Sequence, residues 1–169
     1  MRNIFLCIGS NIEDRLGFLQ SALYHIGELP GTYVLKVSSV YQTEPVGKKD
    51  QPEFLNIAVE IESDFRPAIL LEQLKSLETR LGRKGKERWG PREIDIDILY
   101  YGNLVVSDRD FKVPHAEVGN RRFALIPLVE IARDFRDPLK NLTVSELLKS
   151  CTDQSAVQKT EFSTHLQEH

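Results

Sequence analysis

Isoleucine and aspartate alternate from Ile94 to Ile98, and this alternation constrains the fold more than any other feature of the sequence. Side chains at positions i and i+2 of a β-strand lie on the same face of a sheet. The isoleucines therefore belong to a buried face, and Asp95 and Asp97 belong to the opposite face. A strand of this kind requires an apolar layer against one side of its sheet.

Helices elsewhere in the chain supply such a layer. Apolar residues recur at helical spacing before Pro30, and again after Pro67, where Gly82 suits the end of the helix. A turn at Gly102-Asn103 predicts a hairpin between the aspartate strand and residues 104–106. The strands are predicted at residues 4–8, 33–41, 55–61 and 94–98, and the helices at residues 13–28, 67–81, 121–132 and 143–150. The order β-α-β-β-α-β predicts an α+β fold, a ferredoxin-like antiparallel sheet with helices on one face.

Length and composition set limits on organisation and location. A chain of 169 residues is long enough for one domain with a sizeable core. We expect this domain at residues 1–150, followed by a polar, frayed tail at residues 151–169. The net charge of −3 disfavours general binding to nucleic acid or membranes, and no apolar run suits a signal peptide or a membrane span. We expect a cytoplasmic monomer, with Cys7 as a buried thiol.

Asp95 and Asp97 are candidate metal ligands. In an extended strand their Cβ atoms would lie about 7 Å apart, since each residue rises about 3.3 Å. Two catalytic metal ions lie roughly 3.5–4 Å apart, so both carboxylates could reach such a pair. Magnesium suits the site because it binds one or two carboxylates together with phosphate oxygens and water. Acidic side chains on a half-exposed strand are the competing interpretation, which these two residues alone favour.

The segment from residue 80 to residue 92 is strongly basic. It holds six lysines and arginines against Glu87 alone, whereas the whole chain carries −3. Gly85, Gly90 and Pro91 indicate a loop, and this loop leads directly into the aspartate strand. Cations on a loop beside paired carboxylates suit a polyphosphate, although a solvated basic surface is the usual reason for such a run. The sequence has no glycine-rich phosphate-binding loop, so a nucleotide site would be built from side chains.

Phe54, Asn56 and Phe123 are candidates for binding a flat ring. The alternation along residues 55–61 places Phe54 and Asn56 on the face opposite the strand's apolar side chains. An asparagine amide offers a donor and an acceptor that match the edge of a pterin or a purine, and aromatic rings stack on its face. The competing interpretation is that both phenylalanines belong to the core and that the asparagine caps an edge.

The basic loop and the aspartate strand together resemble the signature of the 6-hydroxymethyl-7,8-dihydropterin pyrophosphokinase family. The signature residues are Gly82-Arg83 and Arg88-Trp89-Gly90-Pro91-Arg92-Glu93-Ile94-Asp95-Ile96-Asp97-Ile98. Further matches follow in family order and spacing at residues 8–11, 38–41, 43–47, 50–56, 113–115, 121–123, 127–128 and 130–132. The resemblance covers residues 4–132, and its long central motif is specific.

The resemblance implies a reaction and its substrates. Diphosphate would pass from ATP to the hydroxymethyl group of 6-hydroxymethyl-7,8-dihydropterin, with release of AMP, in folate biosynthesis. Asp95 and Asp97 would hold two Mg²⁺ ions, and Arg83 and Arg92 would act as catalytic arginines that stabilise phosphate charge. Two long mobile loops, at residues 46–52 and within the basic segment, would close over the substrates and exclude water.

The resemblance also implies binding residues. The pterin-binding residues would be Thr43, Pro45, Val46, Phe54, Asn56, Trp89 and Phe123. The ATP-binding residues would be Glu78, Arg83, Arg88, Trp89, Arg92, Ile98, Lys112, His115 and Arg121. Gly85 departs from the family pattern, because many relatives carry a second arginine there. The resemblance also makes Lys75 a candidate for contact with the adenosine of ATP.

Two other functions remain as alternatives. A ferredoxin-like nucleic-acid-binding module would need exposed aromatic residues on its central strands and an RNP-type pattern, which the sequence lacks. The aspartates on the expected binding face would also repel phosphate. Another magnesium-dependent phosphoryl or nucleotidyl transferase is the second alternative, and the Phe54, Asn56 and Phe123 set favours a pterin acceptor over others.

Overall fold

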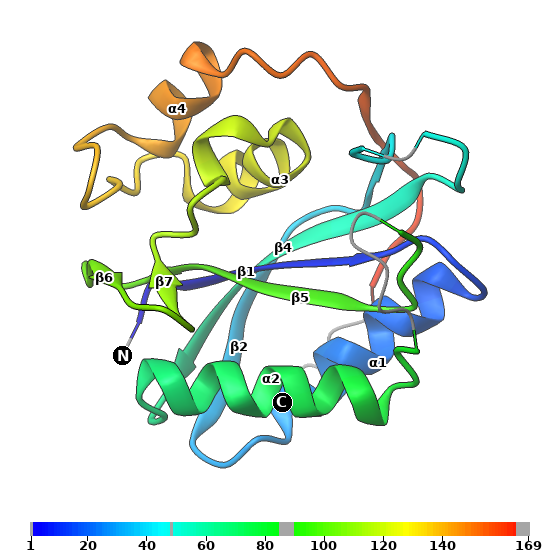
Figure 1. The fold of residues 1–169 in the computed structure, drawn as a ribbon, viewed down its shortest axis with the longest axis horizontal. Coiled ribbons are helices and arrows are strands. Elements are labelled where there is room, and N and C mark those ends of the chain that lie inside the picture. The colour runs from blue at the N-terminus through cyan, green and yellow to red at the C-terminus, as the bar shows by residue number, and fades with distance from the viewer. Residues whose placement is uncertain (1, 48, 85–89, 165–169) are drawn as a thin grey trace.

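Six strands form one antiparallel sheet with β1 and β4 at its centre (Figure 1). The computed structural model describes residues 2–47, 49–84 and 90–164. The strands of this sheet are β1 (Ile4–Ser10), β2 (Thr32–Val37), β3 (Tyr41–Thr43), β4 (Phe54–Ser63), β5 (Asp95–Tyr101) and β8 (Val157–Lys159). The order runs β5-β1-β4-β3-β8, with β2 also paired to β4. Strands β1, β2, β4 and β5, with a helix after β1 and another after β4, follow the predicted ferredoxin-like order, so the α+β fold class is confirmed.

Helices cover both faces of this sheet. The helices are α1 (Arg15–Gly27), α2 (Pro67–Arg80), α3 (Arg122–Ala132) and α4 (Val144–Ser150), with a short 3₁₀ turn at Val118–Asn120. Figure 1 shows α1 and α2 on one side, and α3 and α4 on the other. Within the described ranges, no helix is long and apolar enough to cross a membrane.

The expectation of helices on one face alone is wrong, and β1 explains why. Every residue of β1 is buried. Its residues Leu6 and Ile8 belong to the core beneath α1 and α2, whereas Phe5 and Cys7 belong to a second core with α3 and α4. A strand that is apolar on both faces needs cover on both. The buried thiol predicted for Cys7 is confirmed.

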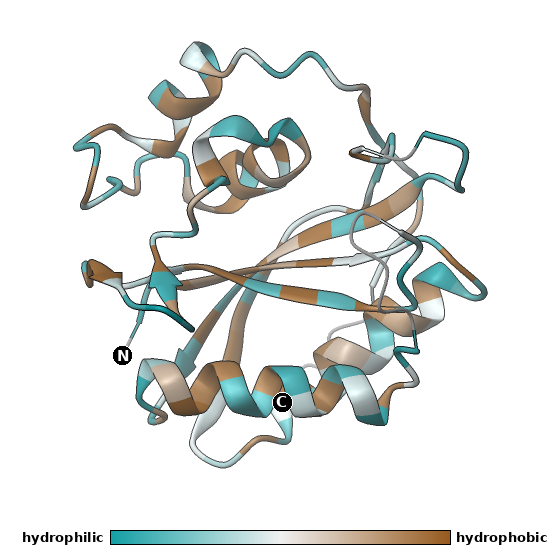
Figure 2. Ribbon diagram, in the orientation of Figure 1, coloured by the Kyte–Doolittle hydropathy of each residue, from teal (hydrophilic) through white to brown (hydrophobic). Residues whose placement is uncertain are grey.

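The two long helices begin and end within two residues of their predicted bounds. The Asp14 side chain accepts a hydrogen bond from the Gly17 amide at 3.0 Å and caps α1. Pro67 opens α2, where its missing N–H needs no partner, and Gly82 follows the helix with a φ of +104°. Figure 2 shows the alternation along β5, whose apolar and polar residues follow one another.

The predicted hairpin at Gly102-Asn103 is wrong. The short strand β6 (Val106–Ser107) pairs with β7 (Lys112–Val113) in a separate two-stranded sheet and does not pair with β5. Gly102 does turn the chain, with a φ of +55°, and its amide donates to the Asn3 carbonyl. This contact directs the chain away from the edge of the large sheet.

The expectation that the tail is frayed is also wrong for residues 151–164. Strand β8 pairs antiparallel with β3 at the edge of the sheet, and Thr160 donates its amide to the Val40 carbonyl. Edge pairing uses backbone groups, so a polar segment can be ordered while burying little apolar surface. Apolar periodicity could not reveal such an element.

Candidate active site

A cavity of about 180 Å³ lies at one end of the sheet, on the face that α3 partly covers. Its position follows from the composition of that face. Phe5, Ala58 and Leu99 lie under α3 and α4, whereas the polar continuation of the same face is left open. The lining residues are Cys7, Gly9, Thr43, Glu44, Val46, Phe54, Asn56, Arg83, Gly90, Arg92, Asp95, Asp97, Arg121 and Phe123.

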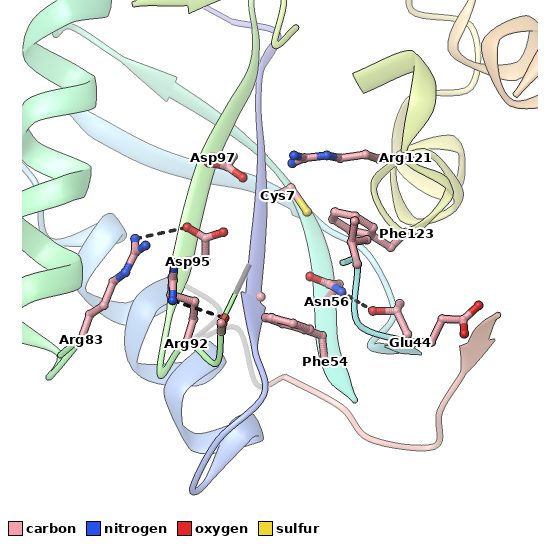
Figure 3. Close-up of a pocket in the computed structure, with 14 residues that line it drawn as sticks. Cys7, Glu44, Phe54, Asn56, Arg83, Arg92, Asp95, Asp97, Arg121 and Phe123 are labelled. Carbon is pink, nitrogen blue, oxygen red and sulfur yellow. Dashed lines mark hydrogen bonds and ion pairs between the residues drawn. The ribbon is translucent and has the colours of Figure 1, made fainter. Parts of the chain in front are cut away.

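Strand register brings the separate sequence motifs together at Gly9. This residue pairs with Asn56 on β4 and with Asp95 on β5. Figure 3 accordingly shows Phe54 and Asn56 on one side of β1, and Asp95 and Asp97 on the other. A Cβ atom at Gly9 would lie 2.4 Å from Asn56 Oδ1, so only glycine fits here without displacing the amide.

The ring-binding candidates form the neutral half of the cavity. Asn56 is buried, and its Nδ2 donates to Thr43 Oγ1 at 2.6 Å, which fixes the orientation of the amide. Phe54 and Phe123 are half-buried and enter the cavity from β4 and from the first turn of α3. The Arg121 guanidinium lies 5.6 Å from the centre of the Phe123 ring, within the range of a cation–π contact.

The charged half of the cavity contains Asp95 and Asp97, whose side chains are 38% and 27% exposed. Arg83 Nη1 lies 3.3 Å from Asp95 Oδ1, and Lys75 Nζ lies 3.9 Å from Asp97 Oδ1. Burial and the neighbouring Asp95 carboxylate raise the pKa of Asp97 to about 6, although Lys75 and Arg121 act in the opposite direction. Burial and the repulsion between the two carboxylates thus disfavour the ionised form of Asp97.

Glu78 lies outside the cavity, although the resemblance assigns it to ATP. Its side chain is 3% exposed and accepts the Ile96 amide at 2.7 Å, between the two aspartates of β5. It also contacts Lys75 at 3.0 Å and Arg83 at 2.5 Å. Glu78 thus orients the two cations that face the aspartates, and its contact with ATP stays a prediction.

Asn11 connects the bases of the two expected loops. Its side-chain Oδ1 accepts a hydrogen bond from the main-chain N–H of Arg92 at 2.8 Å, and its main-chain N–H donates to the Arg92 carbonyl at 3.1 Å. Its Nδ2 donates to Gln51 Oε1 and to the Pro52 carbonyl, both at 2.9 Å. The sequence marks this buried asparagine only as part of the family motif, because its partners lie about 40 and 80 residues away.

Three further predicted ATP contacts, Ile98, Lys112 and His115, are not among the residues that line the cavity. Ile98 is buried in the core, and Lys112 is exposed on β7. His115 donates its amide to the Leu99 carbonyl, and its Nδ1 accepts the Glu117 amide at 3.0 Å. Burial and nearby Arg121 lower the pKa of His115 to about 4, so the ring is neutral at physiological pH. Arg88 and Trp89 lie outside the described residues.

Most of the other predicted residues line the cavity. Among the predicted pterin contacts, Thr43 and Val46 do so, whereas Pro45 is buried beside them. Sequence reasoning did not assign Cys7, Gly9, Glu44 or Gly90 to the site, since their positions depend on register and loop path. Burial and the charges of Asp97 and Asp95 raise the pKa of the Cys7 thiol, which therefore stays protonated and is a poor nucleophile.

The donor set fits magnesium better than zinc. In the described part of the chain, no group of three or more His, Cys, Asp or Glu residues could hold a metal ion. Zinc sites normally take three or four such ligands. Magnesium needs one or two carboxylates and completes its shell with substrate phosphates and water, and Asp95 and Asp97 can supply this.

The cavity of this α+β fold holds paired carboxylates and arginines beside an aromatic slot. This combination is typical of an enzyme that transfers phosphate to a flat acceptor molecule. Residues 5–133 match the family described as 7,8-dihydro-6-hydroxymethylpterin-pyrophosphokinase, and the chain belongs to this family.

Similar proteins agree with this assignment. The chain is 42% identical over 161 residues to the 2-amino-4-hydroxy-6-hydroxymethyldihydropteridine pyrophosphokinase of Methylorubrum extorquens, covering 95% of this chain and all of that protein. It is 35% identical to the protein of the same name from Haemophilus influenzae, covering 93% of this chain and 98% of that protein. The fold matches the crystal structure of Plasmodium falciparum HPPK-DHPS with a TM-score of 0.70 at 16% identity. The match covers 88% of this chain and 43% of that one.

Proposed function

We propose that this protein transfers diphosphate from ATP to the hydroxymethyl group of 6-hydroxymethyl-7,8-dihydropterin and releases AMP, a step of folate biosynthesis. Family membership supports the reaction. The observation that carries the proposal is the pairing at Gly9, which puts a ring-binding slot on one side of β1 and the paired carboxylates on the other. An acceptor in the slot would present its hydroxymethyl group to phosphates bound at the carboxylates.

The pterin ring binds between Phe54 and Phe123. Both rings can stack on a flat heterocycle, and the Asn56 amide reads its polar edge. Thr43 supports this role because it holds the amide in one orientation. Pro45 and Val46 complete the wall of the slot in this proposal, and the pterin contact of Trp89 stays a prediction from the family resemblance.

ATP binds across the charged half, with two Mg²⁺ ions held by Asp95 and Asp97. The raised pKa of Asp97 supports this assignment, because a divalent cation would relieve the repulsion between the carboxylates. Bound magnesium would neutralise the phosphate oxygens and make the β-phosphorus more electrophilic. Asp95 and Asp97 thus fix the position of the phosphates relative to the acceptor.

Arg83, Arg92 and Arg121 stabilise the charge that develops during transfer. The pterin hydroxyl oxygen forms a bond to the β-phosphorus and loses its proton to solvent, the bond from that phosphorus to the α–β bridging oxygen breaks, and AMP leaves. Arg83 is already oriented by Glu78, and the backbone of Arg92 is fixed by Asn11. Once metal and phosphate have replaced the ion pair between Arg83 and Asp95, these donors would face the charge that develops in the transition state.

Product analysis tests the proposal. The purified protein is incubated with ATP, MgCl₂ and 6-hydroxymethyl-7,8-dihydropterin, and nucleotides and pterins are separated by chromatography. We expect AMP to form only when the pterin is present, in equal amount to its diphosphate ester. ADP would instead indicate transfer of a single phosphoryl group, and no turnover would favour a binding module. The cytoplasmic location and the monomeric state remain predictions.

A further inference from the structure

Helix α3 carries Phe123 in its first turn, yet no local side chain caps that turn. Its N-cap residue, Arg121, makes no side-chain capping hydrogen bond. The capping carboxylate comes from the C-terminal segment, since Asp153 Oδ2 accepts the Arg122 amide at 2.9 Å, 31 residues along the chain. A negative charge there also interacts favourably with the positive end of the helix dipole.

The Asp153 carboxylate is itself fixed. Its Oδ1 accepts the Ser155 amide at 2.9 Å and the Ser155 hydroxyl at 2.5 Å. Burial opposes ionisation, but these bonds and the Arg122 amide outweigh it and lower the pKa of Asp153. The cap is therefore ionised and oriented before any substrate arrives.

The same segment is attached at its other end to the opposite wall of the pterin slot. Ala156 donates its amide to Glu44 Oε1 at 2.7 Å, and Glu44 donates its amide to the Ala156 carbonyl at 3.2 Å. Strand β8 then pairs with β3 from Thr43, the residue whose hydroxyl holds Asn56. Both Thr43 and Glu44 line the cavity.

We infer that residues 153–160, here called the strap, position the two walls of the pterin slot relative to each other. One end of the strap holds the helix that carries Phe123, and the other end holds the strand that carries Thr43. Asp153 is the positioning residue at the first of these ends. The inference rests on the proposed function, because it assumes that the pterin binds in this slot. The strap lies beyond residues 5–133, to which the family match is confined.

The spacing of the walls matters because a stacked ring tolerates little change in separation. A site held at its productive spacing before binding loses less conformational entropy when the ligand enters. Loosening the strap should therefore weaken pterin binding more than it disturbs the charged half, because Asp95 and Asp97 lie on β5 and, of the proposed phosphate-binding residues, Arg121 shares the capped turn. A cap that acts only on overall stability would show no such division.

Steady-state kinetics of Asp153→Ala test this inference, with each substrate varied in turn. Loss of a helix cap typically costs about 1 kcal/mol, so we expect the KM for the pterin to rise about fivefold. The kcat and the KM for ATP should change less than the KM for the pterin, because Asp95 and Asp97 lie on β5 and Arg121 shares the capped turn. Asp153→Asn retains an acceptor for one of its two partners and should restore part of the pterin affinity. The control is Asp134→Ala, which removes a 93% exposed aspartate just beyond the other end of α3.

Thermal unfolding separates positioning from simple stabilisation. A lower Tm for Asp153→Ala with an unchanged KM for the pterin at 25 °C, or with both KM values raised equally, would overturn the inference. Ser155→Ala is the milder variant if Asp153→Ala does not fold, and a selective rise in the pterin KM is again the supporting result. A wild-type protein that forms no AMP with the pterin would overturn the proposed function and the inference together. An active wild type with unaffected strap variants would overturn the inference alone.

Discussion

The two halves of the cavity are built in different ways. The ring-binding half is neutral, its buried amide is already hydrogen-bonded to Thr43, and its residues lie on β3, β4 and α3. The charged half is made of ions that contact one another, with Arg83 between Glu78 and Asp95, and with Lys75 near Asp97. One half is fixed by strand register and helix packing, whereas the other is a set of charges held by mutual attraction.

This difference predicts which kinetic parameter each half controls. A preorganised slot contributes equally to the ground state and the transition state, so damage to it should raise KM. The charged half must exchange its internal ion pairs for metal and phosphate, and its groups act on charge that develops during transfer. Damage there should lower kcat. Substitutions in each half can test this division.

The largest effect is expected for Asp97→Ala. The substitution removes a proposed metal ligand without removing core volume, so turnover should fall roughly a thousandfold while the far-UV circular dichroism spectrum stays unchanged. The measurement is AMP formation with magnesium as the only divalent metal, with Asp134→Ala as the matched control. Activity close to wild type would disprove the assigned metal site.

Arg92→Ala should have the next largest effect. Its main-chain contacts with Asn11 remain, so the loop base should persist while the guanidinium is lost. Removing one donor to developing charge costs about a hundredfold in kcat, whereas the Kd for the pterin should change little. Rapid-quench turnover and a fluorescence titration of the pterin give the two values. The control, Arg80→Ala, removes an exposed arginine from the last turn of α2. Lost pterin affinity with a normal kcat would place Arg92 in the ring-binding half.

The sequence could predict the charged half better than it could predict how the halves meet. Alternation alone places Asp95 and Asp97 on one face, and the structure puts both in the cavity. The role of Gly9 depends on simultaneous pairing with β4 and β5, which no local pattern encodes. The role of Glu78 could not be predicted from local sequence either, because its partners belong to β5 and to the loop beyond α2.

The fold shows a similar limit. Helices α1 and α2 follow from apolar periodicity and capping residues, since both signals lie within the helix itself. Strand β8 is polar and depends on an open edge at β3, so its existence follows only from the assembled sheet. The apolar run of β1 indicates that a second helical layer is needed. It does not indicate which helices form that layer.

Gly9→Ala should damage the slot alone. The added Cβ would collide with Asn56 Oδ1 at 2.4 Å and turn the amide away from Thr43. Loss of one oriented amide is worth about tenfold in the KM for the pterin, with kcat for bound substrate reduced less. Gly27→Ala is the control, because its Cβ would meet nothing within 4 Å. A fall in kcat at unchanged KM would show that this side of β1 acts on the chemistry.

The smallest effect concerns stability, and it distinguishes the halves without any substrate. The folded pKa of Asp97 is about 6, above its ordinary value of 3.8. Between these pH values the folded chain keeps a proton that the unfolded chain has released, so the free energy of unfolding falls as pH rises through the window. Above pH 6 the charged site lowers stability, which Asp97→Asn should recover.

We therefore expect Asp97→Asn to be more stable than wild type at pH 8 by about 1 kcal/mol, or about 2–4 °C in Tm. The difference should disappear below about pH 4, where the wild-type carboxyl is protonated in both states. Thermal melts in EDTA at both pH values measure it, and Asn56→Ala serves as the contrasting variant because the slot holds no such charge. Equal Tm values at pH 8 would mean that Lys75 and the arginines already neutralise the site. The charged half would then be as well prepared for its ligands as the slot.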